Sequence, residues 1–188
     1  MEKTLKTQTD LSKYDNSWYK PGSFVKQLLW YFTGRLFVHT HLPYPSGFKN
    51  SILRMFGAKI GNGVVIKPKV NIKYPWFLQI GDHTWIGENV WIDNLTMVTI
   101  ESNVCLSQGC MLLTGNHNYS KSAFDLIVKP IIIEKGAWIG AKATVCPGVK
   151  VGSHAVLTVN SVATTNLDAD GIYQGNPARY IKTRIINH

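Results

Sequence analysis

An aliphatic residue recurs every six positions through most of the 188-residue chain, and this period limits the possible folds more than any other feature. Two steps are eight residues long, from 72 to 80 and from 92 to 100, and one is much longer, from 112 to 133. A six-residue period is typical of a parallel β-helix, in which each hexad supplies one short strand and one turn. The repeated residues are Ile60, Ile66, Ile72, Ile80, Ile86, Ile92, Ile100, Leu106, Leu112, Ile133, Ile139, Val145, Val151 and Leu157.

Three hexads complete one triangular coil, so the repeated residues of successive coils stack into a continuous core. Neighbouring coils then lie about 4.8 Å apart, the spacing of hydrogen-bonded strands. Four positions after most repeated residues the side chain is small or β-branched, as at Val64, Ala137 and Ala143, which suits a tight inward position. We expect the two eight-residue steps, near Trp76 and Met97, to form small bulges at corners of the coil.

The repeat divides the chain into three predicted parts, and the fold class is mainly β. Residues 1–56 are an N-terminal arm and helical cap, residues 57–168 are the β-helix with an inserted loop at about 114–130, and residues 169–188 are a C-terminal tail. The ends of a β-helix are open sheet edges. We therefore expect the helical cap and the tail to cover them.

Within the first part, apolar residues about four apart predict a helix over residues 24–38, with Ser23 as its N-cap. Residues 51–56 are predicted to add a short helical segment. Residues 1–20 are polar and without a period, and we expect them to be mobile or to pack on a neighbouring copy.

The chain carries a formal net charge of +9, which favours anionic partners. We expect no nucleic acid, because no nucleic-acid-binding motif accompanies the charge. The helix at 24–38 combines basic and aromatic residues, so it is a candidate for peripheral contact with an anionic membrane. The alternative is that this helix packs on the body of the protein or on a neighbouring subunit.

The sequence gives no sign of export. Residues 1–6 lack the apolar core of a signal peptide, and no apolar run approaches the ~18 residues of a spanning helix. The cysteines, Cys105, Cys110 and Cys146, have no CxxC or zinc-type spacing, so we interpret them as small apolar residues in a reducing compartment. A cytoplasmic protein is expected, with the inner face of the membrane as a further option.

The repeat, interrupted by a histidine-bearing loop, resembles that of the hexapeptide-repeat acyltransferases, and most of all their colanic acid biosynthesis acetyltransferase branch. The resemblance runs from about residue 14 to about residue 182 and is carried by Trp91-Ile92-Asp93-Asn94-Leu95, Thr114-Gly115-Asn116-His117-Asn118-Tyr119, Gly136-Ala137-Trp138-Ile139-Gly140-Ala141 and Gly175-Asn176-Pro177-Ala178. It implies a left-handed coil, a hand that the period alone does not determine. It also implies a homotrimer that binds acetyl-CoA between neighbouring prisms and acetylates a hydroxyl, often on a sugar or surface-polysaccharide precursor.

His117 is the predicted catalytic residue. Acyl transfer from a thioester to an alcohol needs a base, and imidazole suits that task, with a typical contribution of ~10²–10⁴-fold. The expected route is direct attack of the acceptor on the thioester, without an acyl-enzyme. Asp125 lies in the same loop and is a candidate to orient the imidazole.

The resemblance also implies binding residues. Asp93 matches a position that contacts the acceptor, and the alternative is a turn residue. Trp138 matches a tryptophan beside the catalytic histidine that packs against the acceptor or the pantetheine arm, and the alternative is plain hydrophobic cover. The acetyl-CoA positions are Ala141, Val159, Thr164, Thr165, Arg179 and Lys182. The two cations match phosphate-binding positions, and the alternative is a solvated basic tail. One departure is the run Thr158-Val159-Asn160, where related enzymes have small residues of the Gly-Ala-Gly type; larger side chains would narrow the pantetheine channel.

Two other functions remain open at this point. A zinc enzyme of the carbonic anhydrase type would use three histidines at a subunit interface, but His83 and His154 occupy turn positions of the repeat, so no metal site is expected. A non-enzymatic trimeric scaffold would need only the prism.

Overall fold

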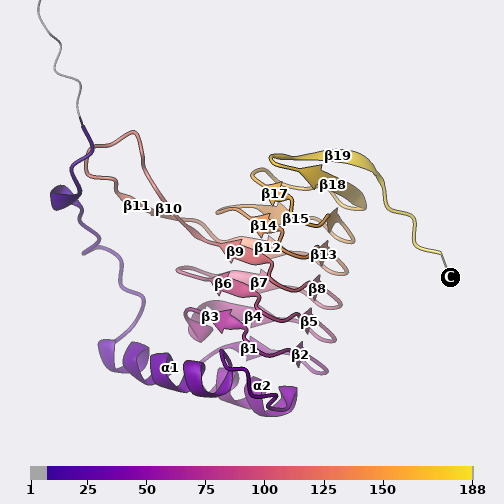
Figure 1. Ribbon diagram of the computed structural model, residues 1–188, viewed down its shortest axis with the longest axis horizontal. Coiled ribbons are helices and arrows are strands. Elements are labelled where there is room, and N and C mark those ends of the chain that lie inside the picture. Colours follow the sequence, from indigo (N-terminus) through magenta and orange to yellow (C-terminus); the bar gives the residue numbers. More distant parts are fainter. Residues whose placement is uncertain (1–7, 188) are drawn as a thin grey trace, which may run out of the picture.

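The computed structural model describes residues 8–187, and these form the predicted left-handed parallel β-helix (Figure 1). Its three faces are sheets A, B and C, whose strands stack in parallel order along the prism. Sheet A contains β1 (Lys59–Ile60), β4 (Leu78–Ile80), β7 (Val98–Ile100), β12 (Ile131–Ile133) and β15 (Lys150–Val151). Sheet B contains β2 (Val65–Ile66), β5 (Trp85–Ile86), β8 (Cys105–Leu106), β13 (Trp138–Ile139) and β16 (Val156–Leu157), and sheet C contains β3 (Asn71–Ile72), β6 (Trp91–Asp93), β9 (Met111–Leu113), β14 (Thr144–Val145) and β17 (Val162–Ala163).

The repeated aliphatic residues form the core as expected. On sheet B, for example, Ile66 pairs with Ile86, which pairs with Leu106, then Ile139 and Leu157. All five side chains are at most 2% exposed. The residue before each of them in the strand points outward, because successive side chains in a strand alternate between its two faces.

Three corners connect the sheets, and the breaks in the repeat all fall at one of them. We call the corners AB, BC and CA after the sheets that they join. The step after Ile72 contains a 3₁₀ helix, η2 (Pro75–Phe77), and the step after Ile92 holds a short irregular turn. The step after Leu112 holds a hairpin of β10 (Gly115–His117) and β11 (Leu126–Val128). Each break links a sheet C strand to the next sheet A strand, so the three stack at corner CA.

The open edge of the first coil is covered by α1 (Phe24–Phe37) and α2 (Ser46–Met55). Ser23 caps α1 as predicted, whereas α2 begins earlier than the segment expected at 51–56. Side chains of the two helices donate hydrogen bonds to the edge carbonyls: Trp30 to Ile72, Lys49 to Ile66, Asn50 to Val64 and Arg54 to Ile60. These donors replace the missing neighbouring strand, which explains why Lys49 is fully buried. None of the helices in residues 8–187 has the length and apolar character needed to cross a bilayer.

The opposite end is covered by strands. The region expected as a tail contains β18 (Gly171–Gly175), which pairs in parallel with β16, and β19 (Ala178–Thr183), which turns back antiparallel to β18. Tyr173 is buried over the last coil. The prism is therefore covered by two helices at one end and by the β18–β19 hairpin at the other (Figure 1).

Candidate active site at corner CA

His117 ends β10 and pairs with Leu126 across the hairpin. Its Nδ1 atom lies 2.9 Å from the carbonyl oxygen of Phe124, and the Phe124 ring stacks on the imidazole with 4.4 Å between centroids. A carbonyl can only accept, so Nδ1 carries a proton, and in the neutral imidazole Nε2 then keeps its lone pair. The hairpin thus fixes the tautomer and the plane of the ring in the form required of a general base.

Asp125, expected to orient the imidazole, makes no hydrogen bond to it. Its carboxylate pairs with Lys121 at 2.9 Å, and the main-chain carbonyl of Phe124 takes the place beside Nδ1. Sequence reasoning missed Phe124 because a main-chain acceptor can come from any residue type. The only available signal was an aromatic residue in the loop of the catalytic histidine.

The N-terminal arm runs along corner CA and reaches the hairpin (Figure 1). The main-chain oxygen of Pro21 accepts from Trp76 in the first break, and the Tyr19 hydroxyl donates to Leu95 in the second. At the hairpin, the ring of Tyr14 lies 5.7 Å from that of His117, between centroids. Over residues 8–20, therefore, the arm packs on its own chain, which corrects the expectation of a mobile or neighbour-bound segment; residues 1–7 lie outside the described range.

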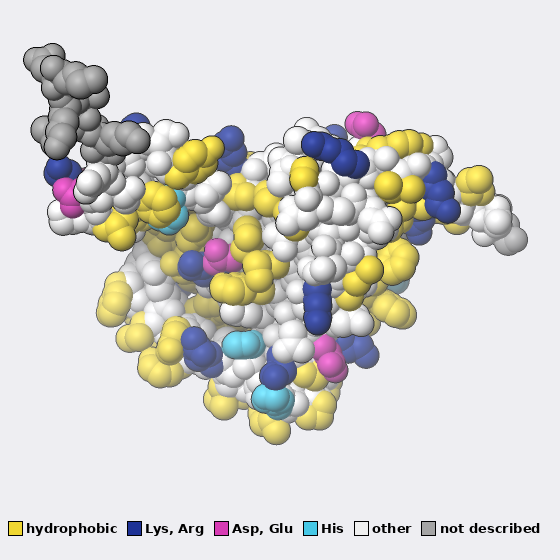
Figure 2. Space-filling model, turned by 45° about the horizontal axis from the view of Figure 1, so that its top comes forward, with side chains coloured by type: hydrophobic (Ala, Val, Ile, Leu, Met, Phe, Trp, Pro, Cys, Tyr) yellow, Lys and Arg dark blue, Asp and Glu magenta, His cyan; other side chains and the backbone are white. Residues whose placement is uncertain are grey.

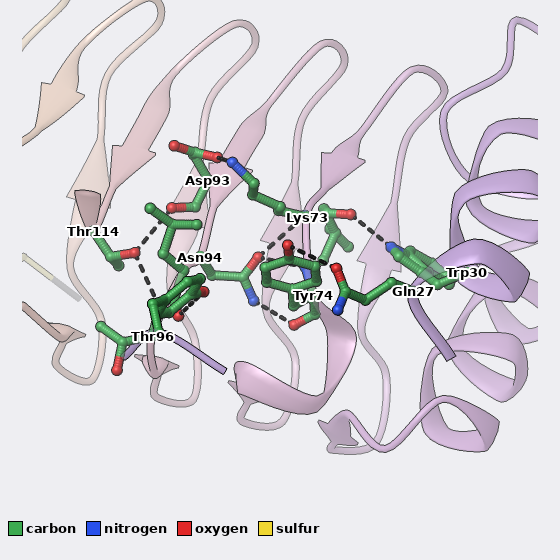
Figure 3. A network of polar contacts seen from close by, with 11 residues as sticks. Gln27, Trp30, Lys73, Tyr74, Asp93, Asn94, Thr96 and Thr114 are labelled. Carbon is green, nitrogen blue, oxygen red and sulfur yellow. Dashed lines mark hydrogen bonds and ion pairs between the residues drawn. The ribbon is translucent and has the colours of Figure 1, made fainter. Parts of the chain in front are cut away.

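Asp93 ends β6 at the same corner, next to a buried polar network (Figure 3). The neighbouring Asn94 is fully buried and makes four hydrogen bonds, to the main chain of Lys73, Tyr74 and Phe77. Thr114 repeats the arrangement one coil further, since its hydroxyl donates to the Asp93 carbonyl. These contacts hold the main chain on both sides of Asp93.

The side chain of Asp93 faces a cavity of about 400 Å³ between α1 and sheet C. Its Oδ1 atom is 3.0 Å from Nζ of Lys73 but is buried without a partner in hydrogen-bond geometry. Tyr31 and Arg35 of α1 and Trp91 of β6 line the same cavity. A buried carboxylate oxygen with unused acceptor capacity, beside aromatic walls, suits a ligand with hydroxyl groups.

Trp138 lies on sheet B, the face opposite corner CA. Its indole Nε1 donates to the Ser107 hydroxyl at 2.8 Å, and the side chain is 46% exposed. A single chain therefore does not bring Trp138 and His117 into one site.

The six residues expected to bind acetyl-CoA also fall into separate groups. Ala141 and Val159 lie in successive turns of corner BC, where Asn160 N donates to the Ala141 carbonyl. Thr164 and Thr165 follow β17 at corner CA, and Arg179 and Lys182 lie on β19 at the end of sheet B. Of the bulkier run, Thr158 makes a hydrogen bond with the Ser161 hydroxyl, whereas Val159 and Asn160 are exposed, Val159 to 65%.

The three cysteines and two of the histidines, His83 and His154, have surroundings that fit a structural role. Burial raises the pKa of the Cys110 thiol to about 12, which leaves it unreactive. His83 and His154 adopt left-handed turn conformations at corner AB. No three His, Cys, Asp or Glu side chains within residues 8–187 of one chain are grouped to hold a metal ion.

Residues 130–164 match the family model described as "Hexapeptide repeat of succinyl-transferase". The chain is 34% identical over 167 residues to "Putative colanic acid biosynthesis acetyltransferase WcaF" of Escherichia coli K12, which covers 89% of this chain and 92% of that relative. It is 27% identical over 149 residues to the galactoside O-acetyltransferase of the same organism, covering 78% and 73%.

The fold is also similar to those of solved acetyltransferase structures. The hexapeptide-repeat acetyltransferase VCA0836 of Vibrio cholerae, complexed with acetyl coenzyme A, has a TM-score of 0.77 at 25% identity, covering 89% of this chain and 93% of that one. Galactoside acetyltransferase in complex with coenzyme A has the same fold, with a TM-score of 0.76 at 24% identity over 85% and 80%. The fold, the repeat and the relative aligned over nearly its whole length lead to one conclusion: this chain belongs to the hexapeptide-repeat acetyltransferases, in the colanic acid biosynthesis acetyltransferase branch.

Proposed function

We propose that the protein transfers an acetyl group from acetyl-CoA to a hydroxyl of a sugar or surface-polysaccharide precursor, with His117 as general base. The observation that carries this proposal is the contact between His117 Nδ1 and the Phe124 carbonyl. In the neutral imidazole it leaves the lone pair on Nε2, which can take a proton from an alcohol.

In this mechanism Nε2 removes the proton of the acceptor hydroxyl as its oxygen attacks the thioester carbonyl. A new C–O bond forms, the C–S bond breaks, and the imidazolium returns the proton to the leaving thiolate. The Phe124 carbonyl stabilises the imidazolium through Nδ1–H, as a fixed acceptor does in other histidine bases. The ring stack holds the imidazole plane during both proton transfers.

For the acceptor, we propose the cavity beside Asp93. The Asp93 carboxylate, which lines this cavity, would accept from a sugar hydroxyl, and Trp91 would pack against the apolar face of the ring. Lys73 neutralises the carboxylate charge across the 3.0 Å ion pair. The class of acceptor is favoured by the polysaccharide pathway named for the relative at 34% identity.

For acetyl-CoA, we propose a groove shared by two copies of a homotrimer. The support is topological: His117 stands at corner CA, whereas Trp138, Arg179 and Lys182 belong to sheet B and its last strands. Only a second chain can bring the sheet B residues close to His117. Arg179 and Lys182 would then bind the phosphates, Ala141 and Val159 the pantetheine, and Thr164 and Thr165 the adenine end. Since acetyl-CoA and sugar precursors are cytoplasmic, we place the reaction in the cytoplasm.

A direct test is acetyl-CoA turnover over a panel of sugars and nucleotide sugars. We expect His117→Ala to lower kcat by about 10²–10⁴-fold, the usual contribution of a general base, without a change in melting temperature. The matched control is His41→Ala, an exposed histidine between α1 and α2, which should be as active as the wild type. Undiminished turnover in His117→Ala would exclude this mechanism.

The shared groove has its own test. The variants His117→Ala and Arg179→Ala/Lys182→Ala are each expected to be inactive or nearly so. When the two are co-expressed, random mixing in a ring of copies restores about a quarter of the sites, because one chain supplies the histidine and its neighbour the cations. Activity that stays at the level of the separate variants would mean that each chain builds its own site.

A further inference from the structure

All of the net charge lies in one third of the chain. Residues 16–81 contain nine Lys and Arg and not one Asp or Glu, whereas the remainder contains eleven of each kind. This basic segment includes the end of the arm, both helices of the cap and the first coil. Within it, Lys20, Lys59 and Lys67 are exposed to solvent.

The same segment presents an apolar stripe. Val25, Leu29, Phe32 and Leu36 follow one another along α1 at the spacing of a single helix face, and each is 56–64% exposed. The buried residues of α1, Trp30 and Gly34, point to the prism instead.

The cap exposes further apolar side chains beyond α1. Leu42 and Met55, in the connection and in α2, are 52% and 74% exposed. Hydrophobic side chains with Lys, Arg and His beside them occupy the lower margin of the molecule in Figure 2, where α1 and α2 lie in Figure 1.

The charge of the basic segment indicates which kind of partner can cover this face. If a second copy covered it end to end, like charges of the two basic segments would come together with no carboxylate in either segment to offset them. Lys49 is buried and Lys73 is paired with Asp93, so seven cations of each copy remain. His39 illustrates the field: burial lowers its pKa, and the charges of Arg35, Lys69 and His41 lower it further. An anionic surface with an apolar interior satisfies both the charge and the stripe.

We propose that the helical cap docks on an anionic lipid bilayer, with the stripe of α1 in the headgroup–acyl boundary and the lysines of the basic segment on the lipid phosphates. With 14 residues, α1 lies along the interface and does not cross it. Because the cap covers one end of the prism, the prism axis stands away from the membrane (Figure 1). Cyclic symmetry would place the cap of every copy on the same side and add avidity. This docking is independent of the proposed reaction.

Vesicle co-sedimentation of the full chain tests the proposal. We expect the wild type to bind phosphatidylcholine vesicles containing phosphatidylglycerol, to bind phosphatidylcholine alone far more weakly, and to be released by salt. Phe32→Ser/Leu36→Ser should lose binding. Lys59→Gln/Lys67→Gln should weaken the partition coefficient by more than tenfold, since one lysine at an anionic surface contributes about fivefold.

Matched controls distinguish binding through the cap from nonspecific adsorption to vesicles. Ile185→Ser/Ile186→Ser removes two exposed apolar side chains, and Lys129→Gln/Lys135→Gln removes two exposed charges, all outside the basic segment; both should bind as the wild type does. His117→Ala should also bind normally, which distinguishes docking from catalysis. The proposal is overturned if the wild type ignores anionic vesicles at low salt. It is also overturned if Phe32→Ser/Leu36→Ser instead lowers the oligomeric mass in light scattering, because the stripe would then be an interface between copies.

Discussion

Corners AB and BC differ from corner CA in a way that separates scaffold from site. At AB and BC every turn has four residues, and the third is in the left-handed conformation, whether it is Gly63, His83, Asn103, Lys142 or Asn160. At CA the first three coils carry η2, an irregular turn and the β10–β11 hairpin, and only after Val145 does a four-residue turn return. Repetition at two corners keeps the coils in register while the third varies.

The variable corner compensates for its irregular backbone with buried polar side chains. Asn94 and Thr114, both fully buried, satisfy main-chain groups that regular turns pair with the neighbouring coil. Specific side-chain hydrogen bonds thus replace the main-chain hydrogen bonds that the irregular backbone lacks. The resulting surface of corner CA positions Asp93, the hairpin of His117 and the arm.

The largest effect on stability that this comparison predicts is at Asn94. Asn94→Ala would leave the amides of Lys73 and Tyr74 and the carbonyls of Tyr74 and Phe77 without their side-chain partner. We expect a loss of about 3–4 kcal/mol in the free energy of unfolding, measured by urea denaturation. Asn103→Gly, in a regular turn, should change it by less than about 0.5 kcal/mol, since glycine adopts the same left-handed conformation. Equal losses in the two variants would remove the distinction between the corners.

The prism could be predicted from the sequence because its core uses one buried aliphatic side chain in every six residues. One aliphatic side chain per hexad is enough to place a strand, and fourteen such positions agree in register. The cover at the C-terminal end was expected from the tail, but its strands were not: β18 and β19 could not be predicted, because the repeat ends before them and their buried residues, such as Tyr173 and Ala178, follow no hexad.

The site was predictable only in part, for a different reason. The identity of His117 as a candidate came from its motif, but its orientation depends on a main-chain oxygen and on Tyr14, about a hundred residues earlier in the chain. The contact from Tyr19 to Leu95 spans 76 residues and has no local signal. Such contacts follow from the stacking of the corner, which is a property of the folded prism.

A smaller loss of stability is expected from a substitution in a turn of a regular corner. Gly136 has φ of +70°, and a Cβ added there would overlap the ring of His154 in the next coil. Gly136→Ala should therefore cost about 2–3 kcal/mol, from the left-handed conformation together with the overlap. Gly109→Ala has a similar φ of +67° with only Lys142 nearby at 3.5 Å, so its cost should be limited to about 1–2 kcal/mol. If the two variants melt at the same temperature, stacking between coils does not restrict the turns of corner AB.

The smallest effect concerns the arm, which joins the cap to the hairpin along corner CA. Tyr19→Phe removes the hydrogen bond to the Leu95 carbonyl and keeps the half-buried ring, so it should lower the free energy of unfolding by about 1 kcal/mol. The more specific readout is amide hydrogen exchange over residues 8–20, which should accelerate because this bond ties the middle of the arm to the second break. Tyr180→Phe, which loses a hydroxyl contact to Thr183 in β19, is the matched control and should leave exchange in the arm unchanged. Unaltered exchange in Tyr19→Phe would show that Pro21 and Tyr14 suffice to hold the arm, and that the second break contributes nothing to the position of His117.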